Sequence, residues 1–121
     1  MTVRKIEIER LSITSSKPFA AVVTAIKASV GRPDMVEFAK ATRSAGSFTE
    51  LERKIQAGLS KTGLMLFMEL DHGAILRKES GNDTPKIVRL VIGNPLIMKE
   101  MAKHVPDAGS YADHHSGGRA A

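Results

Sequence analysis

Two short, nearly continuous apolar segments constrain the fold of this 121-residue chain more than any other feature. They are residues 64–70 (Leu-Met-Leu-Phe-Met-Glu-Leu) and residues 86–92 (Lys-Ile-Val-Arg-Leu-Val-Ile). Runs of this length, bounded by turn residues, are typical of strands that are buried on both faces. Each run is followed by a polar corner, Asp71-His72 or Gly93-Asn94, at which a helix can start. We therefore expect a sheet with these two strands at its centre.

The first residues of the chain alternate between apolar and charged side chains, which predicts a strand over residues 3–14. Ile6 and Ile8 alternate in one phase, and Leu11 and Ile13 continue one residue out of phase. Because side chains on a strand point to opposite faces in turn, this slip indicates a bulge or a change of buried face.

Apolar residues at helical spacing predict four helices around the strands. The helices are expected from Pro18 to Gly31, over residues 33–44, from Ser47 to Thr62, and over residues 95–104. Ser47 and Glu50 match a capping box, in which each side chain accepts the other residue's exposed backbone N–H. Residues 72–80 fit either a hairpin turned at His72-Gly73 or a short helix capped by Asp71.

Length and composition indicate one domain, which we place at residues 1–111, followed by a disordered polar tail at 112–121. A chain of this size buries about two thirds of its unfolded surface, so it can form a core without disulfides. The absence of cysteine suits a reducing compartment. No apolar run approaches the roughly 20 residues of a membrane span, and the charged N-terminus is unlike a secretory signal. We expect a cytoplasmic protein that does not bind membranes.

The chain is basic, with a net charge of +5 and a pI of about 9.7, which favours acidic partners. The basic residues are spread from Arg4 to Arg89 without a run of five or six, so they do not form a basic tail. Four Phe, one Tyr and no Trp also leave few aromatic rings on which bases could stack. Nucleic-acid binding is therefore not expected.

The segment Phe67-Met68-Glu69-Leu70-Asp71-His72-Gly73-Ala74, followed by Ile92-Gly93-Asn94-Pro95, carries a family resemblance. It resembles the hydrophobic-x-x-hydrophobic-Asp-His and Gly-Asn-Pro signatures of the bacterial domain of unknown function 302 family. The likeness extends from about Arg4 to Ala112. It implies an α+β fold, with a small twisted, largely antiparallel sheet and helices packed against it. It also implies that residues 72–80 are helical, and it brings no established activity.

The chain departs from this family after the helix at 95–104. Family members continue through a strand, its hairpin mate and a final helix, whereas this chain continues into a polar tail, as a truncation or a frameshift would produce. Without those last strands the sheet has an open edge with unpaired backbone groups and exposed apolar faces. We therefore expect that the chain is either poorly stable alone or pairs its open edge with another copy, and we favour self-association as a homodimer.

Asp71 and His72 form the first candidate site. Histidine titrates near neutrality, and a neighbouring carboxylate can raise its pKa, so the pair could act as a general base or bind a metal. In the alternative interpretation, which we favour, Asp71 caps the helix and His72 bonds to nearby backbone. Adjacent side chains on a strand point to opposite faces, so the side chains of Asp71 and His72 need not touch.

Gly93 and Asn94 form the second candidate site. A helix that begins after a glycine exposes backbone N–H groups that suit an anion such as phosphate or carboxylate. The favoured alternative is a plain cap by Asn94 with Pro95 in the first turn. If the two central strands were parallel, Asp71, His72 and Asn94 would meet in one pocket, whereas antiparallel strands would separate the two corners.

Three classes of function stay open. The chain could bind a small molecule or an anion as a sensor or accessory module, it could be an enzyme with Asp71 and His72 as its acid–base pair, or it could be a self-associating interaction module. No cofactor and no metal site are expected. Asp113, His114 and His115 lie in the predicted tail, where adjacent histidines seldom bind metal. His104 is expected to interact with the negative end of its helix.

Overall fold

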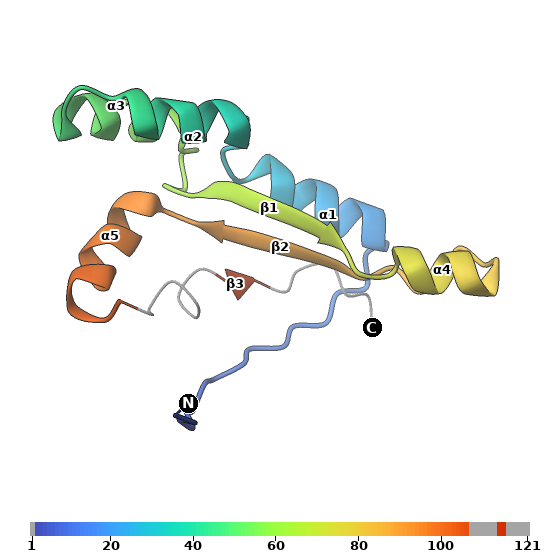
Figure 1. Cartoon of the computed structure of the whole chain (residues 1–121). Coiled ribbons are helices and arrows are strands. Elements are labelled where there is room, and N and C mark those ends of the chain that lie inside the picture. Colours follow the sequence, from blue (N-terminus) through green and yellow to red (C-terminus); the bar gives the residue numbers. More distant parts are fainter. Residues whose placement is uncertain (1, 107–113, 116–121) are drawn as a thin grey trace.

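The computed structural model describes residues 2–106 and 114–115 (Figure 1). Its helices are α1 (Phe19–Ala28), α2 (Met35–Ser44), α3 (Phe48–Gly58), α4 (Ala74–Ser80) and α5 (Pro95–His104). Its strands are β1 (Met65–Asp71), β2 (Val88–Gly93) and the two-residue β3 (His114–His115). The predicted α+β class is confirmed.

The centre of the fold is the antiparallel pairing of β1 with β2. The register runs from Met65 opposite Gly93 to Asp71 opposite Val88, with a bulge between Leu66 and Met68. On its other side β2 pairs antiparallel with β3. The two predicted central strands are therefore neighbours, and the expected antiparallel sheet is confirmed.

A small apolar core lies between this sheet and α1. Val30, Leu90 and Ile92 are buried together, and the partly buried side chains around them are Ile26, Leu64, Leu66 and Val88. Ile26 comes from α1, so the core joins the helix to one face of the strands (Figure 1). An ion pair between Lys27 and Glu69, 2.6 Å long, adds a polar contact between α1 and β1.

Gly31 brings the chain after α1 directly against the start of β1. Its N–H donates to the Leu64 carbonyl and its carbonyl accepts from the Leu66 N–H, at 2.9 and 2.7 Å, which forms a one-residue parallel bridge. A β-carbon at Gly31 would lie 1.9 Å from the Gly58 carbonyl oxygen at the end of α3. Only glycine lets these three backbone segments meet.

Short polar side chains begin three of the helices, as their positions in the sequence suggest. The Asp34 carboxylate accepts from two N–H groups of α2, and the Ser47 hydroxyl accepts from the Glu50 N–H of α3. The predicted capping box differs in its second hydrogen bond. The Glu50 carboxylate accepts from the N–H of Gly46, at 2.9 Å, instead of from the N–H of Ser47. This hydrogen bond, with Lys54 nearby, lowers the pKa of Glu50.

The ambiguity over residues 72–80 is resolved in favour of the helix. β1 ends at Asp71, α4 follows, and Gly81 ends the helix in the left-handed conformation with φ of 72°. The chain then returns through a loop into β2. α4 therefore stands at the closed end of the β1–β2 hairpin (Figure 1).

The predicted strand at 3–14 is wrong for this structure. These residues have no regular secondary structure, and all are exposed. Their alternation is that of a strand, but an isolated strand is not stable without hydrogen-bonded neighbours. Within the described residues the first positions of β1 are bridged by Gly31, and β2 lies between β1 and β3.

The prediction that residues 64–70 are covered on both faces holds only at one end. Met65 is fully buried, but burial falls along β1 until Met68 and Leu70 are 51% and 38% exposed. The helices cover the start of β1 and leave its last residues at the surface. Strand β2 keeps Leu90, Ile92 and Gly93 buried.

Most of the predicted tail at 112–121 lies outside the described residues, apart from the backbone pairing of His114 and His115 with β2. Within the described part of the chain, no helix combines the length and apolar character that crossing a membrane requires.

The close approach at Gly31 predicts a position-specific loss of stability. Gly31→Ala should lower the free energy of unfolding by about 1–3 kcal/mol, because backbone atoms of Gly58 and Ser60 must move to admit the methyl group. Urea denaturation followed by circular dichroism measures the change. Gly46→Ala is the matched control, since its methyl group would meet only the flexible Glu50 side chain at 3.4 Å. Equal effects of the two substitutions would contradict the packing described for Gly31.

Candidate functional site

The antiparallel sheet places the two predicted polar corners at opposite ends of the β1–β2 hairpin. Asp71 lies opposite Val88, where β2 begins, and Gly93 lies opposite Met65, where β1 begins. Since a strand advances about 3.3 Å per residue, the length of the strands separates the corners. The idea that Asp71, His72 and Asn94 meet in one pocket is therefore wrong.

The Gly93-Asn94 corner is a structural junction. The Asn94 side-chain oxygen accepts from the Leu96 N–H at 2.9 Å and caps α5, while its amide nitrogen donates to the Gly63 carbonyl at 3.0 Å. The side chain thus ties the start of α5 to the turn before β1. Gly93 is buried at the end of β2. Both functional groups of Asn94 are used within the fold, as in the capping interpretation of the sequence.

The Asp71 corner is built around a carboxylate–guanidinium pair. The Asp71 carboxylate accepts from both terminal nitrogens of Arg77, at 2.5 and 3.2 Å, and from the Gly73 N–H at 3.1 Å. Arg77 also donates to the Pro85 carbonyl at 2.9 Å. Arg77 therefore links the end of β1 to the loop that precedes β2, and its planar fork fixes the orientation of the carboxylate.

Charge and hydrogen bonding keep both members of this pair ionised. The Arg77 guanidinium lowers the pKa of Asp71, and the carboxylate raises the pKa of Arg77 in return. Hydrogen bonds from the Gly73 and Ala74 N–H groups lower the pKa of Asp71 further. Asp71 is thus a fixed anion at neutral pH, and its low pKa makes it a poor proton acceptor.

His72 lies apart from this pair. Its side chain is exposed and, among the described residues, forms no hydrogen bond or ion pair. Because Asp71 bonds to Arg77 and to the backbone, the geometry does not assemble Asp71 and His72 into an acid–base pair.

Gly73 makes the corner compact. It is buried, and its N–H also donates to the Ile87 carbonyl at 3.2 Å. A β-carbon here would lie 2.4 Å from the Pro85 carbonyl oxygen and 2.6 Å from an Arg77 nitrogen. Glycine therefore allows the loop before β2 to close over the start of α4.

A small pocket opens beside the Asp71–Arg77 pair. Its volume is about 230 Å³, and we call it the corner pocket; it is lined by Phe19, Asp71, Arg77, Asp83, Lys86 and Val88. Phe19 and Val88 give it an apolar wall, at the start of α1 and of β2. The second pair, Lys86 with Asp83, is looser, at 3.4 Å between two exposed side chains.

Only one of the four predicted site residues, Asp71, lines the corner pocket. The other lining residues come from three separate parts of the chain, and sequence reasoning missed them. Arg77 lies six residues after Asp71, which matches no regular helix or strand spacing, and Phe19 arrives from the far end of the sequence. The Asp-His motif was the one signal that marked this corner.

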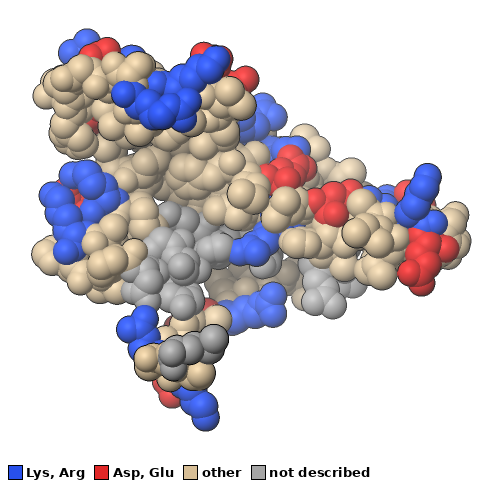
Figure 2. Space-filling model, viewed as in Figure 1, with Lys and Arg blue, Asp and Glu red and all other residues tan. Residues whose placement is uncertain are grey.

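The remaining candidates add no second site. Among the described residues, no group of three or more His, Asp or Glu side chains is placed to hold a metal ion. His104 ends α5, where a basic residue suits the negative helix end. Asp113 lies outside the described residues. Figure 2 shows Lys and Arg in separate groups over α2–α3, α5, α4 and the N-terminal residues, not as one continuous patch on this face.

The Asp71–Arg77 pair predicts a pH-dependent stability. Because the pKa of Asp71 is lower in the folded chain than its ordinary value of 3.8, the ionised carboxylate stabilises the fold at neutral pH. That contribution is lost as the pH falls through the folded pKa. Asp71→Asn should thus have a lower free energy of unfolding than the unmodified chain at pH 7, and this difference should shrink as the pH falls below 3.8.

Urea denaturation at several pH values checks this prediction. Glu79→Gln on α4 is the control, because it removes an exposed carboxylate that forms no ion pair within the described residues. The role of the charged pair would be contradicted if Asp71→Asn and the unmodified chain differed in free energy of unfolding by the same amount at neutral and at acid pH.

Comparison with known proteins agrees with the motifs at both corners. The family model described as "Domain of unknown function DUF302" matches residues 38–112, a range that contains both strands of the β1–β2 hairpin and both polar corners. No curated protein and no solved structure matches the chain. The match covers more than half of the sequence and includes the Asp-His and Gly-Asn-Pro motifs, so the chain belongs to the DUF302 family of domains of unknown function.

Proposed function

We propose that the chain is a binding module that takes a small carboxylate-bearing molecule in the corner pocket. The observation that carries the proposal is the combination of an apolar wall with two cationic side chains in one hollow. Phe19 and Val88 supply the wall, and Arg77 and Lys86 supply the cations. Ligand sites commonly join apolar surface to a few convergent polar groups in this way.

The size of the pocket limits the ligand. Sites for drug-sized molecules have volumes of about 300–1,000 Å³, so a pocket of about 230 Å³ suits a smaller molecule. A short carboxylic acid with a branched or cyclic apolar part would fit the wall of Phe19 and Val88. A nucleotide or a longer lipid would not be enclosed.

The charges favour one carboxylate over a multivalent anion. Asp71 and Asp83 also line the pocket, so its two acidic and two basic side chains balance, and a phosphate would meet repulsion. Arg77 uses three of its five N–H donors in the bonds to Asp71 and Pro85, which leaves donors for a ligand. Lys86 can exchange its loose contact with Asp83 for a ligand carboxylate.

Binding has more support than catalysis at this corner. The carboxylate that an acid–base mechanism would use is held ionised by Arg77, and His72 does not line the pocket. The pocket groups can orient and neutralise a bound acid, but the pKa values of Asp71 and Arg77 are shifted away from neutrality, opposite to what a proton-transfer group requires.

Titration with isobutyrate and with benzoate, followed by ¹H–¹⁵N NMR of the full chain, tests the proposal. We expect saturable shifts of the amide signals of Arg77, Lys86 and Val88 with at least one of the two acids. Lys86→Gln should weaken binding by about tenfold, the loss of one charge-assisted hydrogen bond of roughly 1.4 kcal/mol. Lys78→Gln, which removes an exposed α4 cation outside the pocket, should leave the affinity unchanged.

The proposal fails if neither acid causes saturable shifts at this corner. It also fails if Lys78→Gln weakens binding as much as Lys86→Gln, since the chain would then attract acids only through its overall positive charge.

A further inference from the structure

The N-terminal segment, residues 3–14, has the surface of a strand that lacks its sheet. Its five large apolar side chains are between 48% and 85% exposed; they are Val3, Ile6, Ile8, Leu11 and Ile13. Ile6 and Ile8 alternate with charged residues, and Leu11 and Ile13 alternate with polar residues one position out of phase, so each pair has the spacing of one face of a strand. Among the described strands none pairs with this segment, and its apolar side chains are exposed.

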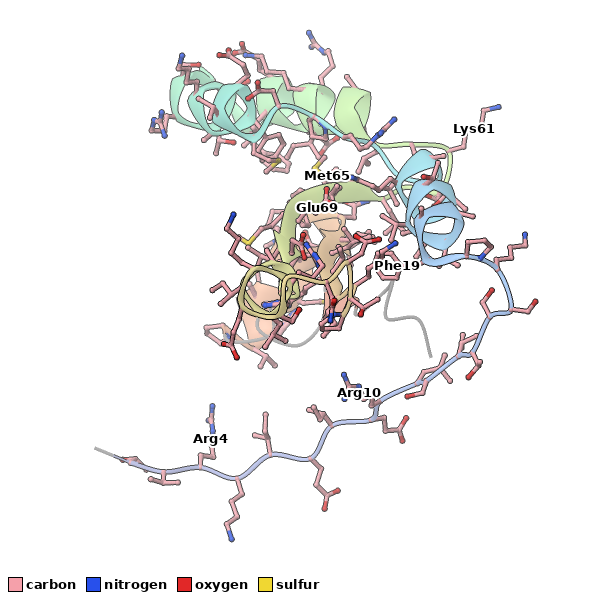
Figure 3. The ribbon with its side chains drawn as sticks, turned by 90° about the vertical axis from the view of Figure 1, so that its right-hand side faces the viewer. Arg4, Arg10, Phe19, Lys61, Met65 and Glu69 are labelled. Atoms are coloured by element: carbon pink, nitrogen blue, oxygen red, sulfur yellow. The ribbon has the colours of Figure 1, made fainter. Side chains whose placement is uncertain are left out.

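The junction with α1 directs the segment away from the sheet of its own chain. The backbone bends at Ser16 and Lys17, and Pro18 is extended, with φ of −57° and ψ of 147°. In Figure 3 the chain leaves Phe19, which lies beside the sheet, and runs past Arg10 and Arg4 below the ribbon of the sheet. Figure 1 shows the same direction from the side.

The last residues of β1 offer the complementary surface. In the described sheet β1 is an edge strand, and the bridge from Gly31 covers only its start, at Met65 and Leu66. From Met68 to Asp71 the strand is exposed, including the apolar side chains of Met68 and Leu70. An exposed, apolar edge with unpaired backbone groups is a template for a further strand.

We infer that the N-terminal segment of one copy adds as a strand to the outer edge of β1 in a second copy. The exchange is reciprocal, so the two chains are related by a two-fold axis and each segment finds an edge. The seven residues of β1 and the twelve of the segment are long enough for such a ladder. A second copy of the chain is the partner that fits best. Each copy has one N-terminal segment and one open β1 edge, so a two-fold dimer covers both segments and both edges.

The mass of the full chain in solution tests the inference first. Sedimentation equilibrium across about a hundredfold range of concentration should give twice the chain mass of 13.1 kDa at the upper end. The double variant Ile6→Asp/Ile8→Asp should stay monomeric. The matched double variant Val36→Asp/Ile75→Asp changes apolar residues on α2 and α4 that are 67% and 81% exposed, and it should dimerise normally.

Cysteine cross-linking distinguishes strand exchange between two chains from pairing within one chain. The sequence contains no cysteine, so only the introduced thiols can form disulfides. A chain with Ile8→Cys and a chain with Leu70→Cys are mixed and oxidised mildly. We expect a mixed disulfide dimer that forms at least tenfold faster than the dimer between Ile8→Cys and Ile75→Cys. Circular dichroism of each variant shows that it is folded.

Three results would overturn the inference. The unmodified chain could be a monomer at every concentration, or the control pair could cross-link as fast as the edge pair. Alternatively, a chain carrying both Ile8→Cys and Leu70→Cys could close its disulfide internally while the mixed single variants stay apart, which would assign the segment to its own β1 edge.

Discussion

The antiparallel pairing of β1 with β2 is the contact on which the rest of this structure depends. It places Ile92 opposite Leu66 and Leu90 opposite Glu69, and these two residues of β2 form the core together with Val30 and the partly buried Ile26 of α1. The same pairing makes α4 the closed end of a hairpin and sends α5 away from the opposite end. The two polar corners serve different purposes as a result: the Asn94 side chain fastens one end of the sheet, and the Asp71–Arg77 pair shapes the pocket at the other.

The modest core explains why so much apolar surface is left outside. Within the described residues the buried apolar side chains are only Val30, Ile55, Met65, Leu90 and Ile92. Close backbone contacts at Gly31 and Gly58 draw α1 and α3 to the start of β1. Met68 and Leu70 in the far half of β1, and the apolar side chains of the N-terminal segment, then stay exposed.

The sequence predicted what local patterns encode. Both central strands, the caps at Ser47 and Asn94 and the helix at 95–104 follow from periodicity and capping chemistry, and the helix after Asp71 follows from the family motifs. The misses are all long-range. Alternation identified residues 3–14 as strand-like, but a strand needs a neighbour that its own sequence does not contain. Strand direction, which separates the two corners, and the approach of Phe19 to Asp71 depend on tertiary packing in the same way.

Phe19 connects the N-terminal segment with the corner pocket. It is the first residue of α1, it follows the bend that carries the N-terminal segment, and it forms part of the wall of the corner pocket. A strand exchange that fixes the direction of residues 3–14 would also fix Pro18 and hence the position of this ring. A ligand against Phe19 would restrain the same junction from the other side. Strand addition and ligand binding would then be linked, and by thermodynamic reciprocity each would change the affinity of the other by the same factor.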